Sequence, residues 1–359
     1  MKKHLLLLTF LSVIGNAQIV RKYSNEFLNI GAGARGLAMG GAVISNQNDV
    51  YAPMWNPAGL TEVESDWQGA AMHAEYFESI AKYDYISFAK ALDSKDGVLG
   101  ISIVRLGVDN ILNTTQMIDS EGNIDYDKIS KFSTSDYAGI ISYAFRPGGN
   151  QKLSVGINAK IVYRNIGKFA NGFGFGFDAG AIYRADSGYQ FGAMLRDATT
   201  TVNFWSINQK ELSTVVNGEE FNPAPKDKME ITMPKLNLGV SKNFEINRDL
   251  ELLPEAGLNV DFAKTAAVIS TDFASISPYL GAELSFQKMI FVRAGLNRFQ
   301  TVTDIEDLKR KVSMQPSAGI GIKYKGLTLD YAITNTGIGG SNYFSNFFSL
   351  KLDMRDFRY

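Results

Sequence analysis

From Asp66 to the C-terminus, the chain consists of short segments in which apolar and polar residues alternate. A period of two indicates β-strands with two different faces, because successive side chains of a strand point to opposite sides. The strands predicted in this way, about fourteen in all, span residues 66–75, 83–92, 97–108, 134–146, 152–165, 172–185, 189–198, 234–244, 250–263, 277–287, 289–299, 315–325, 327–335 and 342–354.

The connections between these strands alternate between short and long. The short ones are residues 93–96, 147–151, 186–188, 245–249, 287–288 and 325–326, and the longer ones are residues 109–133, 166–171, 199–233, 264–276, 300–314 and 336–341. Bacterial transmembrane barrels have this arrangement, with short periplasmic turns and longer extracellular loops. The pattern predicts that residues 66–359 form a 14-stranded antiparallel transmembrane β-barrel in the outer membrane, with both barrel termini in the periplasm. A soluble β-sandwich or propeller is the weaker alternative.

The strand faces support this interpretation. In residues 172–185 one face carries alternating Phe and Ala, which suits lipid, and the other carries Gly and Asp178, which suits a wet lumen. Extending the alternation through the hairpins places Glu283 opposite Arg293, and Lys323 diagonally next to Asp330. We expect these luminal charge pairs to neutralise one another, because an isolated ion in a narrow interior would be costly.

The first 65 residues divide into two parts. Lys2 and Lys3, the apolar stretch from Leu5 to Ile14 and the small residues before Gln18 predict a signal peptide at residues 1–17. Residues 18–65 contain the glycine-rich run NIGAGARGLAMGG at residues 29–41 and a turn sequence, NPAG, at residues 56–59. Small residues and a tight turn suit a confined path, so this segment is predicted to fold into the lumen as a plug.

Composition excludes several function classes. With no Cys and only two His among 359 residues, neither a catalytic triad nor a zinc site of several imidazoles is expected. After loss of Lys2 and Lys3, 34 basic and 37 acidic residues remain. This slight acidic excess does not favour binding of nucleic acid. The G-x-G-x-x-G at Gly31, Gly33 and Gly36 lacks the βαβ context of a dinucleotide site. We expect neither an enzyme nor a cofactor.

Three short motifs carry a family resemblance: GLAMGGA at residues 36–42, NDV at residues 48–50 and WNPAGL at residues 55–60. Together they resemble the N-terminal signature of the PorV/PorQ family, a branch of the FadL-like outer-membrane barrels. The resemblance implies a 14-stranded barrel with an N-terminal hatch in its lumen. The residues that it places in the plug motif are Gly36, Gly40, Gly41, Asp49, Trp55, Asn56, Pro57 and Gly59.

The resemblance favours the first of three hypotheses. The first is a component of the type IX secretion system of the Bacteroidota, which binds the translocon, the C-terminal domains of cargo or the attachment complex, or serves gliding motility. The second is a FadL-like importer of hydrophobic small molecules such as long-chain fatty acids, and the third is a structural protein. An importer requires an apolar pocket between hatch and wall, whereas a docking barrel requires apolar loop residues.

The longest predicted loop, residues 199–233, favours docking. Aromatic side chains exposed on a loop are candidate anchors for a partner protein, although the same side chains could pack the loop onto the barrel rim. The candidate anchors are Phe204, Trp205, Ile207 and Phe221.

Overall fold

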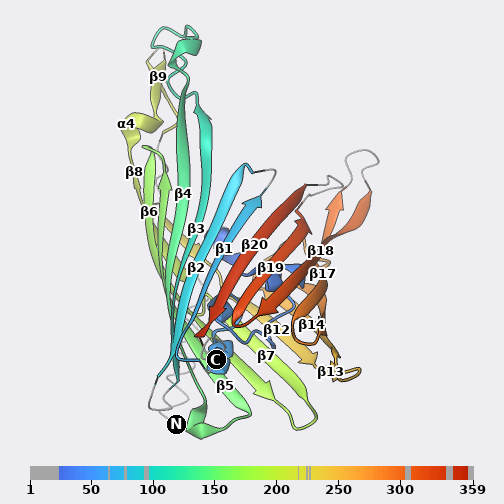
Figure 1. Cartoon of the computed structure of the whole chain (residues 1–359). Helices are drawn as coiled ribbons and strands as arrows, with labels where there is room; N and C mark the ends of the chain where they lie inside the picture. Colours follow the sequence, from blue (N-terminus) through green and yellow to red (C-terminus); the bar gives the residue numbers. More distant parts are fainter. Residues whose placement is uncertain are drawn as a thin grey trace, which may run out of the picture.

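The computed structural model describes residues 24–63, 65–76, 79–92, 97–216, 218–223, 225, 228–303, 309–336 and 343–354. In this part of the chain the backbone forms a closed antiparallel β-barrel of 14 strands, as the alternation predicts (Figure 1). The predicted signal peptide and the aromatic C-terminal residue Tyr359 lie outside the described residues.

The wall strands are named in chain order. They are β1 (Gln68–Tyr76), β2 (Ala81–Ala91), β3 (Val98–Asn113), β4 (Ser130–Phe145), β5 (Leu153–Ile166), β6 (Ala170–Arg184), β7 (Tyr189–Arg196) continued by β8 (Thr201–Ile207), β11 (Met229–Thr232) continued by β12 (Lys235–Lys242) and β13 (Phe244–Glu245), β14 (Leu250–Asp261), β16 (Ser275–Phe286), β17 (Ile290–Thr303), β18 (Arg310–Tyr324), β19 (Leu327–Asn335) and β20 (Phe344–Asp353). The barrel closes where β1 pairs with β20, from Gln68 opposite Asp353 to Glu75 opposite Asn346.

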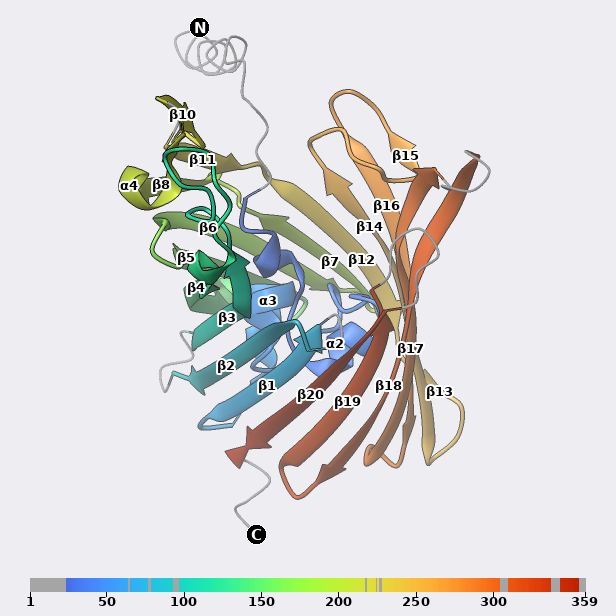
Figure 2. The same ribbon diagram turned by 90° about the horizontal axis from the view of Figure 1, so that it is seen from above.

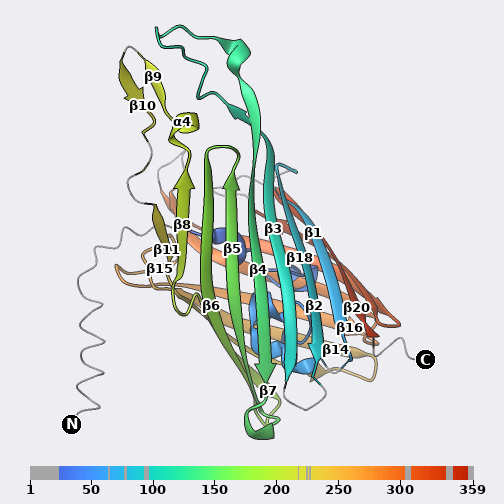
Figure 3. The same cartoon turned by 90° about the vertical axis from the view of Figure 1, so that its left-hand side faces the viewer.

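The wall is higher on one side than on the other. Strands β3 and β4 have 16 residues each, whereas β1 and β19 have nine. The tall strands rise well above β1, β2 and β20 and carry η4 (Tyr126–Lys128) at their top, next to α4 (Gln209–Leu212) and the hairpin of β9 (Thr214–Val216) and β10 (Glu219–Phe221) (Figures 1 and 3). We call this the long-loop end. The opposite short-turn end contains η5 (Pro147–Gly149).

The two longest predicted loops are shorter than the sequence suggested. The expected loop at residues 109–133 begins after Asn113 and ends before Ser130, because β3 and β4 continue into it. The expected loop at residues 199–233 contains the wall strands β8 and β11, which pair with each other from Thr201 opposite Thr232 to Phe204 opposite Met229. The alternation of Thr201–Ile207 is that of a strand, and the sequence-based loop assignment was wrong there.

A break separates β7 from β8. Strand β6 pairs with both, and Asp197 and Thr200 between them have positive φ angles of 49° and 59°. At the break, the side chain of Asp197 points to the inner side of the wall. Its Oδ1 atom lies 2.6 Å from the Nζ atom of buried Lys160. Asp178 contacts the same Nζ atom at 2.6 Å, so the ammonium group has two carboxylate partners. The contacts of Lys160 with the two carboxylates stabilise the irregular backbone between β7 and β8.

The N-terminal segment, residues 24–63, lies inside the ring of strands (Figure 2). It contains η2 (Glu26–Asn29), α2 (Ala34–Ala38), α3 (Ala52–Trp55) and η3 (Pro57–Glu62), none longer than six residues. Helix α2 packs against β17 to β20 and η3 packs against β3 to β6. We call residues 24–63 the plug segment. Its apolar side chains and the inward side chains of the wall form the hydrophobic core.

The outer surface of the wall is apolar. Outward side chains on strands around the barrel include Ile101, Ile141, Phe175 and Ile320, each at least half exposed. Such a surface suits lipid, because exposed apolar area of this extent is unfavourable in water. A search of the described helices finds none that is long and apolar enough to cross a membrane.

Candidate functional site: the plug segment and its cavity

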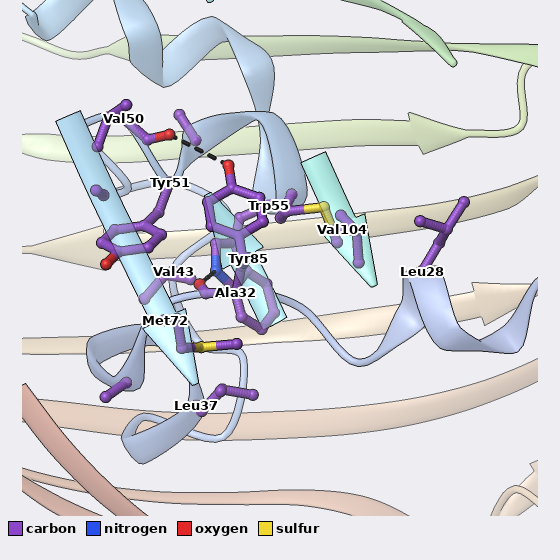
Figure 4. Packing of buried hydrophobic residues seen from close by; sticks show 14 of the residues in the cluster. Leu28, Ala32, Leu37, Val43, Val50, Tyr51, Trp55, Met72, Tyr85 and Val104 are labelled. Atoms are coloured by element: carbon purple, nitrogen blue, oxygen red, sulfur yellow. Dashed lines mark hydrogen bonds between the residues drawn. The ribbon is translucent and has the colours of Figure 1, made fainter. Parts of the chain in front are cut away.

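The indole ring of Trp55 packs against the glycine run of the plug segment. Side chains on Gly31 or Gly36 would place Cβ 2.3 Å or 2.7 Å from the indole ring, so only glycine fits there. The indole Nε1 donates a hydrogen bond to the carbonyl oxygen of Ala32 at 2.7 Å (Figure 4). Gly41, with φ of +80°, also faces the ring. The G-x-G-x-x-G spacing therefore has a packing role in this fold.

The turn at residues 56–59 fixes the other half of the plug segment. The side chain of Asn56 accepts a hydrogen bond from the Ala58 amide and donates to the carbonyl oxygens of Ile44 (2.9 Å) and Ala181 (3.1 Å). Pro57 starts η3, where a missing backbone N–H costs nothing. A Cβ on Gly59 would lie 1.9 Å from the carbonyl oxygen of Gln47. The motif ties the plug segment to itself and to β6.

Asp49 connects the plug segment to β20 of the wall. Its Oδ2 atom lies 2.7 Å from the Nζ atom of Lys351, and its Oδ1 accepts hydrogen bonds from Gln47 and the Tyr51 amide. Burial by itself would raise the pKa of Asp49, but the Lys351 ammonium group and the hydrogen bonds outweigh burial and hold this pKa below its usual value. The carboxylate is therefore charged at neutral pH. Close by, Tyr51 stacks on Tyr85 of β2 at 5.6 Å (Figure 4).

Glu255 of β14 binds the middle of the plug segment. Its carboxylate accepts hydrogen bonds from the Ile44 amide (2.7 Å), the Ser45 amide (3.1 Å) and the Asn46 side chain (2.8 Å). The Ser45 hydroxyl donates a fourth at 2.5 Å. Glu255 is 2% exposed, so the hydrogen-bonding capacity of its oxygens is satisfied by these donors and not by water. The sequence analysis did not single out this residue.

The predicted luminal charge pairs are partly present. Glu283 lies opposite Arg293, the register expected from the alternation, and the Oε2 and Nε atoms are 2.5 Å apart. Arg293 also contacts Asp330 at 2.6 Å, and Arg35 of the plug segment contacts Glu283 at 2.9 Å. Lys323 lies opposite Thr328, while the carboxylate of Asp330 is bound by Arg293. The pair thus belongs to a network that joins wall and plug.

A cavity of about 760 Å³ lies between the plug segment and the wall, toward the long-loop end. Its lining from the plug segment includes Phe27, Ile30, Leu37 and Trp55, and a wall strand adds Leu106. This volume is within the range of about 300–1,000 Å³ typical of sites for organic ligands. Among the described residues, no group of three or more His, Cys, Asp or Glu side chains is arranged to hold a metal ion.

The four predicted docking residues do not form one exposed loop. Phe204 and Trp205 are consecutive residues of β8, so their side chains lie on opposite faces of the wall. Phe204 is 52% exposed, whereas Trp205 faces inward, with the Arg164 guanidinium 5.2 Å from its ring centre. Ile207 is half-buried in the same strand, and Phe221 is exposed on β10. Of the four, only Phe221 lies in the upper hairpin.

A closed β-barrel of 14 strands with an N-terminal segment in its lumen defines a fold class, the β-barrels of outer membranes. Comparison with solved structures agrees with this class. The chain is similar to the toluene transporter TbuX of Ralstonia pickettii (13% identity, 90% of this chain and 98% of that one, TM-score 0.56). It is also similar to the monoaromatic hydrocarbon channel CymD (11%, 90% and 98%, 0.57) and to a FadL homologue of Pseudomonas aeruginosa (11%, 90% and 98%, 0.51).

At these identities the likeness shows the fold alone. No protein-family model and no curated protein sequence matches the chain. Two of the solved structures named above are a toluene transporter and a monoaromatic hydrocarbon channel, and the third is a FadL homologue; none of them supports the narrower resemblance to PorV and PorQ.

Proposed function

We propose that this protein is an outer-membrane channel for small hydrophobic molecules. The observation that carries the proposal is the cavity between plug segment and wall, bounded by Phe27, Leu37 and Leu106. A docking barrel has no need of such a space, whereas a channel requires a site where its substrate leaves water. The transport of toluene and other monoaromatic hydrocarbons by proteins of the same fold supports the proposal.

The orientation follows from the loops. In outer-membrane barrels the longer connections face the outside and the short turns face the periplasm. With this orientation the cavity opens toward the cell surface, and the plug segment separates it from the periplasm. Uptake then requires the substrate to enter the cavity first and the plug contacts to rearrange afterwards.

Uptake of radiolabelled toluene and dodecanoate by cells that carry or lack the gene tests the proposal. Filling the cavity with Leu37→Trp should reduce uptake about tenfold or more, because the added ring occupies space that the substrate needs. The control is Leu238→Trp, on the exposed outer face of β12. Uptake that is unchanged by loss of the gene would contradict the proposal.

A second candidate function is the docking of proteins at the cell surface, as a type IX secretion component would require. The observation that favours it is the tall side of the barrel, which carries the exposed side chains of Ile124, Tyr126 and Phe221 on its upper hairpins. Exposed aromatic residues are frequent anchors of protein interfaces. Affinity purification of the protein from native outer membranes, with and without these side chains, distinguishes this function from transport.

A further inference from the structure

The cavity has an apolar side and a polar side. Each side is lined by strands that are neighbours in the barrel. One arc of the wall, from β20 through β1 and β2 to β3, contributes apolar and aromatic side chains, namely Phe347, Tyr76, Ala81, Leu106 and Val108. Tyr76 and Phe347 pack edge to face with ring centres 5.2 Å apart. Together with Phe27, Ile30 and Leu37 of the plug segment they form a continuous hydrophobic side.

The other arc, from β12 to β19, contributes carboxamides and hydroxyls. The residues are Asn237, Asn259, Ser277, Asn297, Gln315 and Thr334. Strand register makes neighbours of them, because Asn259 lies opposite both Asn237 and Ser277. On the next strands Asn297 lies opposite Gln315. This side of the cavity is therefore a sheet of neutral hydrogen-bonding groups extending across six strands.

A β-bulge in β17 extends the polar side toward the opening. The register shifts between Asn297 and Gln300, and Arg298 within the bulge has φ of 49°. The extra residues return Gln300 to the inner face, where it also lines the cavity. Without the bulge, the alternation would direct Gln300 outward.

The charged groups on the polar side are mostly engaged. Lys235 contacts Glu26 at 3.2 Å and Asp261 at 3.5 Å, and Arg196 donates to the Met54 carbonyl oxygen and the Asn237 side chain. Arg298 is exposed, so water already solvates its charge. A ligand that meets this side thus encounters mainly neutral donors and acceptors.

We infer that the cavity takes an uncharged amphiphile, with an apolar body and several hydroxyl or carbonyl groups, in preference to a pure hydrocarbon or a fatty-acid anion. The inference rests on the proposed transport function and names its substrate class. The Oδ1 atom of Asn259 already accepts a hydrogen bond from Asn237 at 2.6 Å. A hydrocarbon against the Nδ2 group of Asn259 and the amide of Gln315 would exclude water from these groups without replacing the lost hydrogen bonds. A hydroxylated ligand replaces them, while its apolar body covers Phe347 and Leu106.

Three probes with one chain length separate the possibilities: dodecane, dodecanoate and monododecanoylglycerol. Trp55 lines the cavity, so a Trp67→Phe, Trp205→Phe background leaves it as the sole fluorescent indole. With the protein in lipid nanodiscs, the shift of Trp55 emission on binding gives a dissociation constant for each probe. Partition of the probe into lipid cancels when two variants are compared with the same probe.

The decisive variant combines Asn259→Leu with Gln315→Met, and Gln151→Met in a short-turn connection is the control. Monododecanoylglycerol should bind the variant about tenfold more weakly or worse than the parent, whereas dodecane should bind equally or more tightly. Heat-modifiable migration verifies that each barrel is folded. The control should leave all three constants unchanged.

Two results overturn the inference and leave the transport function standing. One is tighter binding of dodecane or dodecanoate than of monododecanoylglycerol to the parent protein, after each constant is corrected for partition of the probe into protein-free nanodiscs. The other is an equal loss for all three probes in the variant. If none of the probes shifts Trp55 emission and the gene does not affect uptake, the transport function itself fails. The two proposals can therefore be rejected separately.

Discussion

Glycines on the inner face of the wall determine how closely the plug segment approaches the strands. A Cβ on Gly281 would lie 2.4 Å from the carbonyl oxygen of Met39, and one on Gly295 would lie 2.1 Å from the Met39 carbonyl carbon. Both distances are shorter than any ordinary contact, so the two backbones touch directly. The alternation of the sequence places these glycines in the lumen, but only the folded chain shows what they touch.

Replacing Gly281 by alanine should displace the plug segment. We expect Gly281→Ala to destabilise the plug contacts by about 1–3 kcal/mol and to produce measurable ion conductance in planar bilayers. Gly139→Ala is the matched control, because a Cβ there would meet nothing within 4 Å. Equal conductance of the two variants would show that the wall does not hold the plug at Gly281.

Glu255 should be the residue on which plug docking depends most. Glu255→Leu leaves the amides of Ile44 and Ser45 and the side chain of Asn46 buried without an acceptor, at a cost of about 3 kcal/mol or more. The variant should show faster proteolysis within residues 24–63 and a lower temperature for loss of the folded band. Glu245→Leu, at an exposed carboxylate, should show neither change.

The ion pair of Asp49 with Lys351 predicts a pH dependence. Because the pKa of Asp49 in the folded protein lies below the usual 3.8, its contribution to stability is present above that value and is lost as pH falls through the folded pKa. Protease resistance of the plug segment should be the same at pH 7 and pH 5 and should decrease below about pH 3.8. In Asp49→Asn the resistance should already be reduced at pH 7. A decrease that starts near pH 6 in the parent would exclude this explanation.

Among the elements, the wall strands could be predicted from sequence because each must present one face to lipid and one to the lumen. The period-two pattern also predicted the hairpin register that places Glu283 opposite Arg293. The break between β7 and β8 could not be predicted. It depends on an ion pair between Asp197 and Lys160, residues 37 positions apart, and no local pattern specifies such a contact.

The upper hairpins of the tall side provide the test for protein docking. If this face binds a partner, Tyr126→Ala with Phe221→Ala should reduce its capture from detergent-solubilised membranes about tenfold, because both rings are exposed and free to be buried in an interface. Phe204→Ala, on the outer wall, is the control. Undiminished capture by the double variant would remove the hairpins from any docking model.

For the whole molecule, the sequence predicted a plugged barrel and favoured docking, but it held no information on the cavity that favours transport. That choice depends on whether space remains between plug and wall, and therefore on how Phe27 and Leu37 pack against strands far away in the sequence. The polar side of the cavity could not be predicted from the sequence either. Asn259 and Gln315 line the same cavity only because of the order of the strands around the barrel. Glu255 was missed since a single acidic residue on a strand carries no motif.

The course of the plug segment through the lumen constrains biogenesis. The segment starts at Ser24, bonded to Asn203 and Glu230, and ends at Glu62, bonded to Arg146 and Arg184 at the opposite end. Because its backbone touches the wall, it cannot be threaded into a finished barrel. The wall must close around it, and the closing seam joins strands whose paired residues are up to 285 positions apart. The plug segment precedes every wall strand in the chain and must therefore remain associated with the wall until β20 pairs with β1. Closure of the seam is expected to limit the rate of assembly.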